Sequence, residues 1–295
     1  MKLVRYGEPG REKPGILDAA GRVRDLSGRL ADLQGAALTA EGLDRLRAVA
    51  PETLPQVPGM PQQDLRLGPC VTGVGKFIGV GLNYADHAAE AGLPIPEEPV
   101  LFTKWTSCIA GPDDDLVLPP GSTTTDWEVE LGIVIGTGGR NIPEARALEH
   151  VAGFCVVNDI SERDWQINRA GTWDKGKGYD GFGPIGPWLV TPDEIDDLNS
   201  LHLWLELDGV RRQDGSTSAM VFGPAQIVAY CSRFATLHPG DLITTGTPPG
   251  VGMGQKPPVY LRAGQVMRLG IDGLGIQTQR VLAADAGHDK ASRAR

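Results

Sequence analysis

The chain has 295 residues with 28 basic and 37 acidic side chains, which gives a formal net charge of −9 at pH 7. This length suits one large domain or two unequal ones, and the acidity argues against a nucleic-acid-binding protein, because phosphate binding needs a basic face. No apolar run predicts a signal peptide or a membrane helix. Four scattered cysteines without a CxxC pair favour a cytoplasmic protein without structural zinc or disulfides.

The first part of the chain predicts a small N-terminal domain. Short alternating segments indicate strands, and leucines three residues apart indicate one helix. We expect strands at 1–6, 15–18 and 23–26 and a helix at 39–49. Four prolines, Pro51, Pro55, Pro58 and Pro61, then indicate a linker, because proline supplies no backbone donor to a sheet. The N-terminal domain and its linker therefore span 1–66.

Most of the remaining chain predicts short strands with few helices between them, so the expected fold class is α+β and mainly β. Strands are expected at 77–80, 129–135, 154–157, 201–207, 210–213 and 241–245. Helices are expected after Asn83, which we assign as an N-cap, and at Pro143 and Pro224. The main domain would span 70–283, and the charged residues 285–295 predict a flexible tail.

Residues 171–178 are similar to a phosphate-binding loop but lack one of its functional groups. A Walker A loop ends in Lys followed by Ser or Thr, whose hydroxyl binds magnesium. Here Gly178 follows Lys177. The sequence therefore does not predict a nucleotide-phosphate site.

Three carboxylates lie in or directly after predicted buried strands. Glu128 and Glu130 alternate along one strand and so share a face, and the apolar residues that follow predict burial, which needs a compensating cation. The alternative is a solvent-facing strand with two unrelated glutamates. Asp159 ends a second apolar strand, where it either joins the glutamates or only caps a following helix. Three such oxygen ligands would favour magnesium, manganese or calcium over zinc.

A short predicted helix carries His87 and Glu90. The two residues are three apart and share one helical face. A carboxylate beside an imidazole orients the ring and raises its basicity, which is the arrangement that activates water. The alternative is an ordinary ion pair on the surface of a small helix.

Two glycine-rich segments are further candidates for a binding site. Lys177 lies among glycines that allow a ligand to approach the backbone closely, so its ammonium could balance the acidic group and hold a substrate oxyanion. The alternative is an exposed flexible loop. Residues 244–252 follow a strand directly, and their hydroxyls and amides could bind a carboxylate or could only turn the chain.

Six runs of sequence together resemble the fumarylacetoacetate hydrolase family. Their order and spacing match the family over roughly residues 70–283. The runs are 79–87 (GVGLNYADH), 99–104 (PVLFTK), 128–132 (EVELG), 158–164 (NDISERD), 175–177 (KGK) and 245–252 (TGTPPGVG). The first module is similar to the small N-terminal domain of many bacterial members.

This resemblance implies a fumarylacetoacetate hydrolase-type β-roll that forms a homodimer and acts on a small 2-oxo acid. From the acidity and the lack of long apolar runs we expect no nucleic-acid or membrane partner. It implies a Mg²⁺ or Mn²⁺ ion, a lid helix that closes over the substrate and a catalytic lysine. The implied metal ligands are Glu128, Glu130 and Asp159, and the implied catalytic residues are His87, Glu90 and Lys177. Near the 2-oxo acid the resemblance places Arg163, Gln166, Thr247 and Lys104.

Within the family, residues 1–7 (MKLVRYG) and 171–177 (GTWDKGK) look most like a bacterial sugar-acid subgroup. That resemblance implies hydrolysis of 2,4-diketo-3-deoxy-L-rhamnonate or L-fuconate to pyruvate and lactate. Relatives with similar motifs decarboxylate oxaloacetate, cleave acylpyruvates or isomerise diene-dioates. A 2-oxo-acid-binding sensor would need the carboxylates but no base, so the presence of both His87 and Glu90 favours an enzyme.

Overall fold

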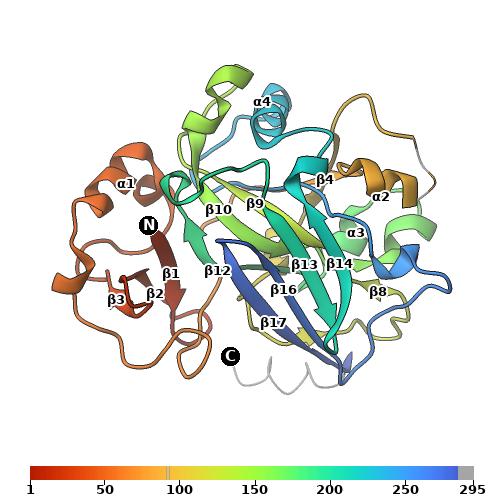
Figure 1. Cartoon of the computed structure of the whole chain (residues 1–295), viewed down its shortest axis with the longest axis horizontal. Helices are drawn as coiled ribbons and strands as arrows, with labels where there is room; N and C mark the ends of the chain where they lie inside the picture. The colour runs from red at the N-terminus through yellow and green to blue at the C-terminus, as the bar shows by residue number, and fades with distance from the viewer. Residues whose placement is uncertain (91, 93, 285–295) are drawn as a thin grey trace.

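A large mixed sheet forms the centre of the computed structural model, which describes residues 1–90, 92 and 94–284 (Figure 1). Its strands follow the order β3-β2-β1-β12-β10-β9-β15-β4-β5, and β6 pairs with β12. They are β3 (Val23–Asp25), β2 (Lys13–Leu17), β1 (Lys2–Tyr6), β12 (Gly183–Val190), β10 (Val151–Asn158), β9 (Val129–Ile135), β15 (Leu242–Thr244), β4 (Phe77–Gly81), β5 (Val100–Lys104) and β6 (Ile109–Ala110). Every residue of β9 and β10 is buried, which explains their nearly unbroken apolar sequences.

A second, five-stranded sheet packs on the first, and Figure 1 shows it in front of β9, β10 and β12. Its order is β14 (Val210–Ser216), β13 (His202–Leu207), β16 (Val266–Ile271), β17 (Gly275–Leu282) and β7 (Leu116–Val117). Buried and half-buried residues alternate along β13, because only one face of this sheet meets the core. A two-stranded ribbon pairs β8 (Thr125–Asp126) with β11 (Ser161–Glu162). The predicted mainly β, α+β fold is therefore confirmed.

The helices are short and lie around the sheets. They are α1 (Ala40–Arg47), α2 (Ala85–Glu90), α3 (Asp174–Lys177), α4 (Pro224–Phe234) and the π-helix η5 (Asp164–Asn168). The 3₁₀ turns are η1 (Gly35–Leu38), η2 (Pro51–Thr53), η3 (Thr106–Cys108), η4 (Glu144–His150), η6 (Pro192–Glu194), η7 (Thr217–Ala219) and η8 (Gly252–Gly254). In the described part of the chain, no helix is long and apolar enough to cross a membrane.

The predicted cap at Asn83 is wrong, and the alternative role of Asp159 as a helix cap is excluded. Asn83 does not cap the helix after it, because its side chain donates to the carbonyls of Phe222 and Thr245 instead, and α2 begins only at Ala85. No capped helix follows Asp159 directly either. The next residues form β11, and the π-helix η5 comes after it.

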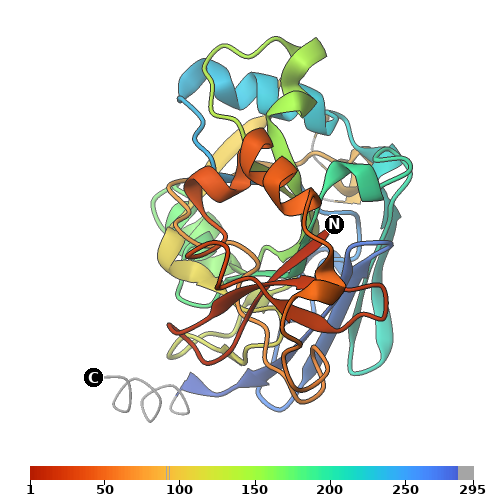
Figure 2. The ribbon, with the colours of Figure 1, turned by 90° about the vertical axis from the view of Figure 1, so that its left-hand side faces the viewer.

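The N-terminal strands extend the central sheet. Strand β1 pairs antiparallel with β12, with Lys2 opposite Val190 and Leu3 opposite Leu189. Figure 2 shows β1–β3 and α1 on the face turned toward the viewer. Apolar side chains of this module, among them Leu3, join the same buried cluster as the main sheets. The predicted tail at 285–295 lies outside the described residues.

Candidate active site

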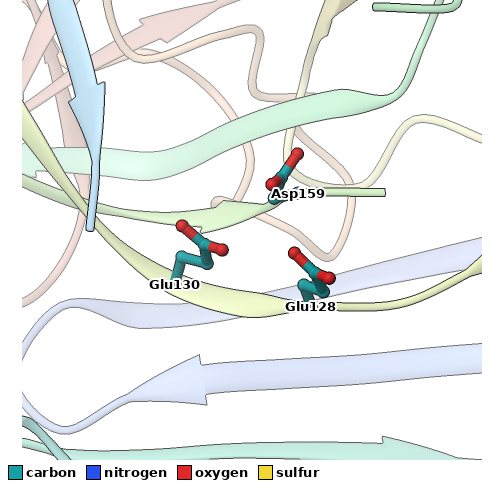
Figure 3. A group of neighbouring side chains, drawn as sticks. All are labelled: Glu128, Glu130 and Asp159. Atoms are coloured by element: carbon teal, nitrogen blue, oxygen red, sulfur yellow. The ribbon is translucent and has the colours of Figure 1, made fainter. Parts of the chain in front are cut away.

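Three buried carboxylates come together at the ends of two neighbouring strands. Oxygen atoms of Glu128, Glu130 and Asp159 all lie within 4.8 Å of one another. Figure 3 shows Glu128 and Glu130 on the same side of one strand, with Asp159 at the end of the next. At most 5% of each residue is exposed. The structure therefore brings together all three predicted metal ligands.

The pairing of β9 with β10 explains this convergence. Val157 lies opposite Glu130, and Asn158 lies opposite Val129. The amide of Asp159 then donates to the carbonyl of Glu128 at 2.8 Å. The strand period of two places Glu130 on the same face as Glu128, so all three carboxylates meet on one face of the sheet.

Two lysines compensate part of this negative charge. Lys177 Nζ lies 2.7 Å from Glu128 Oε2 and 2.6 Å from Asp159 Oδ2. Lys104 Nζ lies 2.6 Å from Asp159 Oδ1, and both lysines are buried. Burial alone would lower the pKa of Lys177, but the charges of Asp159 and Glu128 outweigh burial and raise that pKa. Lys177 belongs to helix α3 and is not part of an exposed loop.

Glu130 has a different environment from the other two carboxylates. Thr244 Oγ1 donates to Glu130 Oε2 at 2.5 Å, and the amide of Gly246 donates to the same oxygen at 2.8 Å. Burial and the neighbouring charges of Asp159 and Glu128 raise the pKa of Glu130 well above its usual value. Burial would also raise the pKa of Glu128, but the nearby cations, with Lys177 first, hold it well below its usual range.

Arg163 links the carboxylate group to a fourth acid, Asp126. Its Nη2 lies 2.7 Å from Glu128 Oε1 and 2.8 Å from Asp126 Oδ2, and its Nη1 donates to Gln166 Oε1 at 3.0 Å. Asp126 also accepts hydrogen bonds from the amides of Gly252 at 2.7 Å and Met253 at 3.0 Å. We did not predict a role for Asp126, although it precedes Glu128 and Glu130 in the same alternating pattern.

The predicted dyad on α2 is formed. His87 Nδ1 lies 3.0 Å from Glu90 Oε2. Glu90 Oε1 accepts a hydrogen bond from the amide of Gly250, also at 3.0 Å. A carboxylate in its ionised form only accepts hydrogen bonds, so this contact favours the tautomer of the neutral ring in which Nδ1 donates and Nε2 has the lone pair. The helix is anchored at its start by Asn83 and by Tyr84, which is completely buried.

A pocket of about 310 Å³ joins these groups. Among the ten predicted site residues, seven line it: His87, Glu128, Glu130, Arg163, Gln166, Lys177 and Thr247. Glu90, Asp159 and Lys104 do not line it, but Glu90 contacts His87, and Lys104 contacts Asp159. Lys104 therefore holds Asp159 in place from outside the pocket. The hydroxyl of Thr247 donates to Val129 O at 2.8 Å and accepts from Gln213 at 2.7 Å, so it fixes the pocket wall to β9.

The donor set fits a hard divalent cation. All three ligands offer oxygen atoms, which magnesium and manganese prefer. The three predicted metal ligands and the buried side chains linked to them by ion pairs, directly or through Arg163, comprise four carboxylates and three cations. The acids are Asp126, Glu128, Glu130 and Asp159, and the cations are Lys104, Arg163 and Lys177. Glu130 is the member of the metal group without an ion pair to a described residue, so a bound cation would compensate it.

Comparison with known proteins identifies the family of this chain. A protein of Burkholderia cenocepacia, whose name assigns it to the hydrolases without a substrate, is 66% identical over 95% of this chain and 98% of its own length. A solved structure named as a 2-hydroxyhepta-2,4-diene-1,7-dioate isomerase from Mycobacterium abscessus is 32% identical, covers 96% of this chain and 99% of its own, and has a TM-score of 0.81.

A third similar structure is a maleylpyruvate hydrolase from Sphingobium sp. SYK-6 in complex with manganese(II) and pyruvate. It is 26% identical, covers 96% of this chain and 99% of its own, and has a TM-score of 0.78. Residues 76–282 match the family described as fumarylacetoacetate (FAA) hydrolase, C-terminal. That match includes all the site residues described above, and the chain belongs to the fumarylacetoacetate hydrolase family.

Proposed function

We propose that the protein is a metal-dependent hydrolase that cleaves a carbon–carbon bond of a 2,4-diketo acid and releases pyruvate. The observation that carries this proposal is the position of the His87–Glu90 pair in the same pocket as the buried carboxylates. The carboxylates alone would also suit a binding protein, but a sensor needs no base. The manganese and pyruvate in the similar maleylpyruvate hydrolase support the same chemistry.

Glu128, Glu130 and Asp159 would hold Mg²⁺ or Mn²⁺. When bound, such an ion supplies Lewis-acid polarisation of the carboxylate and keto oxygens of a 2-oxo acid. Lys177 adds a fixed positive charge on the same side of the pocket. Arg163 keeps Glu128 and Gln166 in position, because its guanidinium contacts both side chains.

His87 acts as the general base in this proposal. Its Nε2 takes a proton from water, while Glu90 stabilises the imidazolium through Nδ1–H. The water oxygen adds to the C4 carbonyl, and the C3–C4 bond then breaks with its electron pair left on C3. Lys177 stabilises the resulting pyruvate enolate, and the proton on His87 returns to C3. The products are pyruvate and the carboxylic acid that contains C4.

The finer substrate assignment follows from the subgroup resemblance. We propose 2,4-diketo-3-deoxy-L-rhamnonate or L-fuconate, whose hydrolysis yields pyruvate and lactate. Both names describe the same 2,4-diketo acid, because the two ketones and the C3 methylene leave C5 as the only stereocentre, and this acid has the diketo group that the proposed mechanism requires.

A pyruvate-release screen tests the function. Protein treated with a chelator and then supplied with Mg²⁺ or Mn²⁺ would be given acylpyruvates, oxaloacetate and the diketo sugar acid. We expect metal-dependent pyruvate release from diketo acids and none in the chelator. Metal binding with no turnover of any diketo acid would contradict the proposal and favour the sensor.

A further inference from the structure

Beyond the charged groups, the pocket has an apolar wall. Six of its lining residues are apolar: Val80, Leu82, Phe102, Ile167, Trp173 and Met253. Two of these residues, Phe102 and Trp173, are in contact, with ring centroids 5.4 Å apart and planes tilted by 52°. An apolar wall favours an apolar part of the ligand, because burial removes both surfaces from water.

Two glycines of β4 make room for the aromatic pair. A Cβ on Gly79 would lie 2.2 Å from Phe102 Cζ, and a Cβ on Gly81 would lie 2.6 Å from Trp173 Cζ3. Neither separation is possible for real atoms, so any larger residue would displace the rings. The Gly79-Val80-Gly81 run of the sequence therefore serves to place this wall.

The wall begins beside the acidic group and ends at the pocket mouth. Lys177 Nζ, which contacts Glu128 and Asp159, lies 5.1 Å from the centroid of Phe102. Ile167 lines the same pocket with 52% of its surface exposed. A 2-oxo acid whose carboxylate end lies at the acidic group would extend the rest of its chain along Phe102 and Trp173 toward Ile167.

Among the described residues, no lysine or arginine that lines the pocket is left without a carboxylate partner, so none is available for a second ligand carboxylate. These residues are Arg163 and Lys177, and both already pair with carboxylates. Arg169 follows Ile167 by two residues in the chain. It does not line the pocket, and it pairs with Asp164 at 2.6 Å.

We propose that this site selects 2-oxo acids that have a single carboxylate and a neutral, mainly apolar tail, and that it discriminates against diacids. For the substrate, this inference rests on the function proposed above. A second carboxylate at the end of the tail would lie against Trp173 or Ile167 without a cation to compensate it, which is unfavourable. The diketo sugar acid has a neutral tail that ends in a methyl group, so it belongs to the selected class.

Binding of non-cleavable ligands tests this selectivity without any turnover. Titration calorimetry with Mn²⁺-loaded protein would compare 2-oxooctanoate with 2-oxooctanedioate, which have the same chain length and differ in their terminal group. We expect the monoacid to bind at least about tenfold more tightly. Affinity should also rise along 2-oxobutanoate, 2-oxopentanoate and 2-oxohexanoate by roughly fourfold per methylene. Equal or tighter binding of the diacid would overturn the inference.

A change at the mouth should shift the preference. Ile167→Lys places a cation beside the end of the tail, at a half-exposed position that tolerates substitution. We expect this variant to gain about tenfold or more in affinity for 2-oxooctanedioate. Ile167→Gln, the matched neutral control, should gain none. An equal gain in both variants would contradict the role of charge.

The cleavable pair 2,4-dioxooctanoate and 2,4-dioxooctanedioate then separates the two proposals. Faster pyruvate release from the monoacid supports both. If neither compound is hydrolysed while the monoacid analogue still binds more tightly, the proposed function fails and the inferred selectivity stands. Preferential hydrolysis of the diacid supports the function and overturns the selectivity.

Discussion

The carboxylate of Glu90 accepts a hydrogen bond from the backbone amide of Gly250 at 3.0 Å. The other oxygen of that carboxylate lies 3.0 Å from His87 Nδ1. One side chain therefore fastens α2 to the 250–254 segment and orients the proposed base. Movement of α2 away from this segment would break the contact with Gly250, whereas His87 and Glu90 both belong to α2 and would move together.

His87→Ala should separate hydrolysis from decarboxylation. Hydrolysis needs a base to activate water, whereas decarboxylation of oxaloacetate needs only a stabilised enolate. We expect the variant to lose diketo-acid hydrolysis by about 10²–10⁴-fold, as is typical of a general base, and to keep most oxaloacetate decarboxylation. Both rates are measured by pyruvate release.

Lys177→Ala is the comparison for this experiment. Lys177 contacts Glu128 and Asp159 and is proposed to stabilise the enolate, which both reactions share. Both activities should therefore fall in this variant. If His87→Ala lost the two activities equally, with its metal response intact, the separate roles of base and lysine would be wrong.

Glu130→Gln should stabilise the metal-free protein and remove its response to metal. The pKa of Glu130 is raised in the folded state, so the folded protein loses stability as the pH rises above the carboxyl pKa of the unfolded chain. Glutamine avoids this loss, and its carbonyl can still accept from Thr244 and Gly246. In a chelator we expect the melting temperature to rise by about 2 °C or more at pH 8 and by less at pH 5.

The same variant has a second readout. Mg²⁺ or Mn²⁺ should raise the melting temperature of the native protein, more strongly at higher pH because Glu130 must lose its proton to bind a cation. Glu130→Gln should show no such increase. A variant that keeps the full metal response would contradict the assignment of Glu130 as a ligand.

Asp126→Asn should destabilise the protein although Asp126 is not a proposed metal ligand. Its carboxylate pairs with Arg163 and accepts hydrogen bonds from the amides of Gly252 and Met253. The NH₂ group of asparagine would replace one of these acceptor oxygens and would face a donor. We expect a loss of about 3 kcal/mol in the free energy of unfolding, measured by denaturant titration. Asp164→Asn, at the solvent-accessible pair with Arg169, should cost much less, because water screens the pair. Similar losses in both variants would argue against a special role for Asp126.

Movement of α2 should be confined to the part after Tyr84. Asn83 bonds to Phe222 and Thr245, and Tyr84 is completely buried, whereas the helix itself is fastened through Glu90. Hydrogen exchange at residues 86–90 should slow when metal and oxalate are added, and exchange at 83–84 should not change. Equal protection of 86–90 in both conditions would rule out a lid at this helix.

The sequence was most informative where the chemistry follows local periodicity. The two-residue strand period indicated that Glu128 and Glu130 share a face, and the helical period indicated that His87 meets Glu90. Asp126 was missed although it obeys the same strand period. Its partners Gly252 and Met253 are about 126 residues away, and no local pattern reports such a contact.

Local reasoning also failed where a polar side chain had more than one use. Asn83 has the residue type of a helix cap, but the structure uses its amide to join Phe222 to Thr245. The role of Lys104 came from the family resemblance alone, and only the fold shows that it pairs with Asp159 without lining the pocket. The positions of these side chains depend on contacts between segments that are far apart in the chain, and the periodicity of the sequence does not predict such contacts.

The pairing of β1 with β12 has a consequence for the independence of the main domain. The family match begins at residue 76, so a chain cut to that segment would lack β1. The backbone groups of β12 that face Lys2 and Leu3 would then have no partner, and open strand edges recruit other chains. We therefore expect the N-terminal strands to prevent self-association through β12. A chain that starts at residue 76 should aggregate even though every site residue is present.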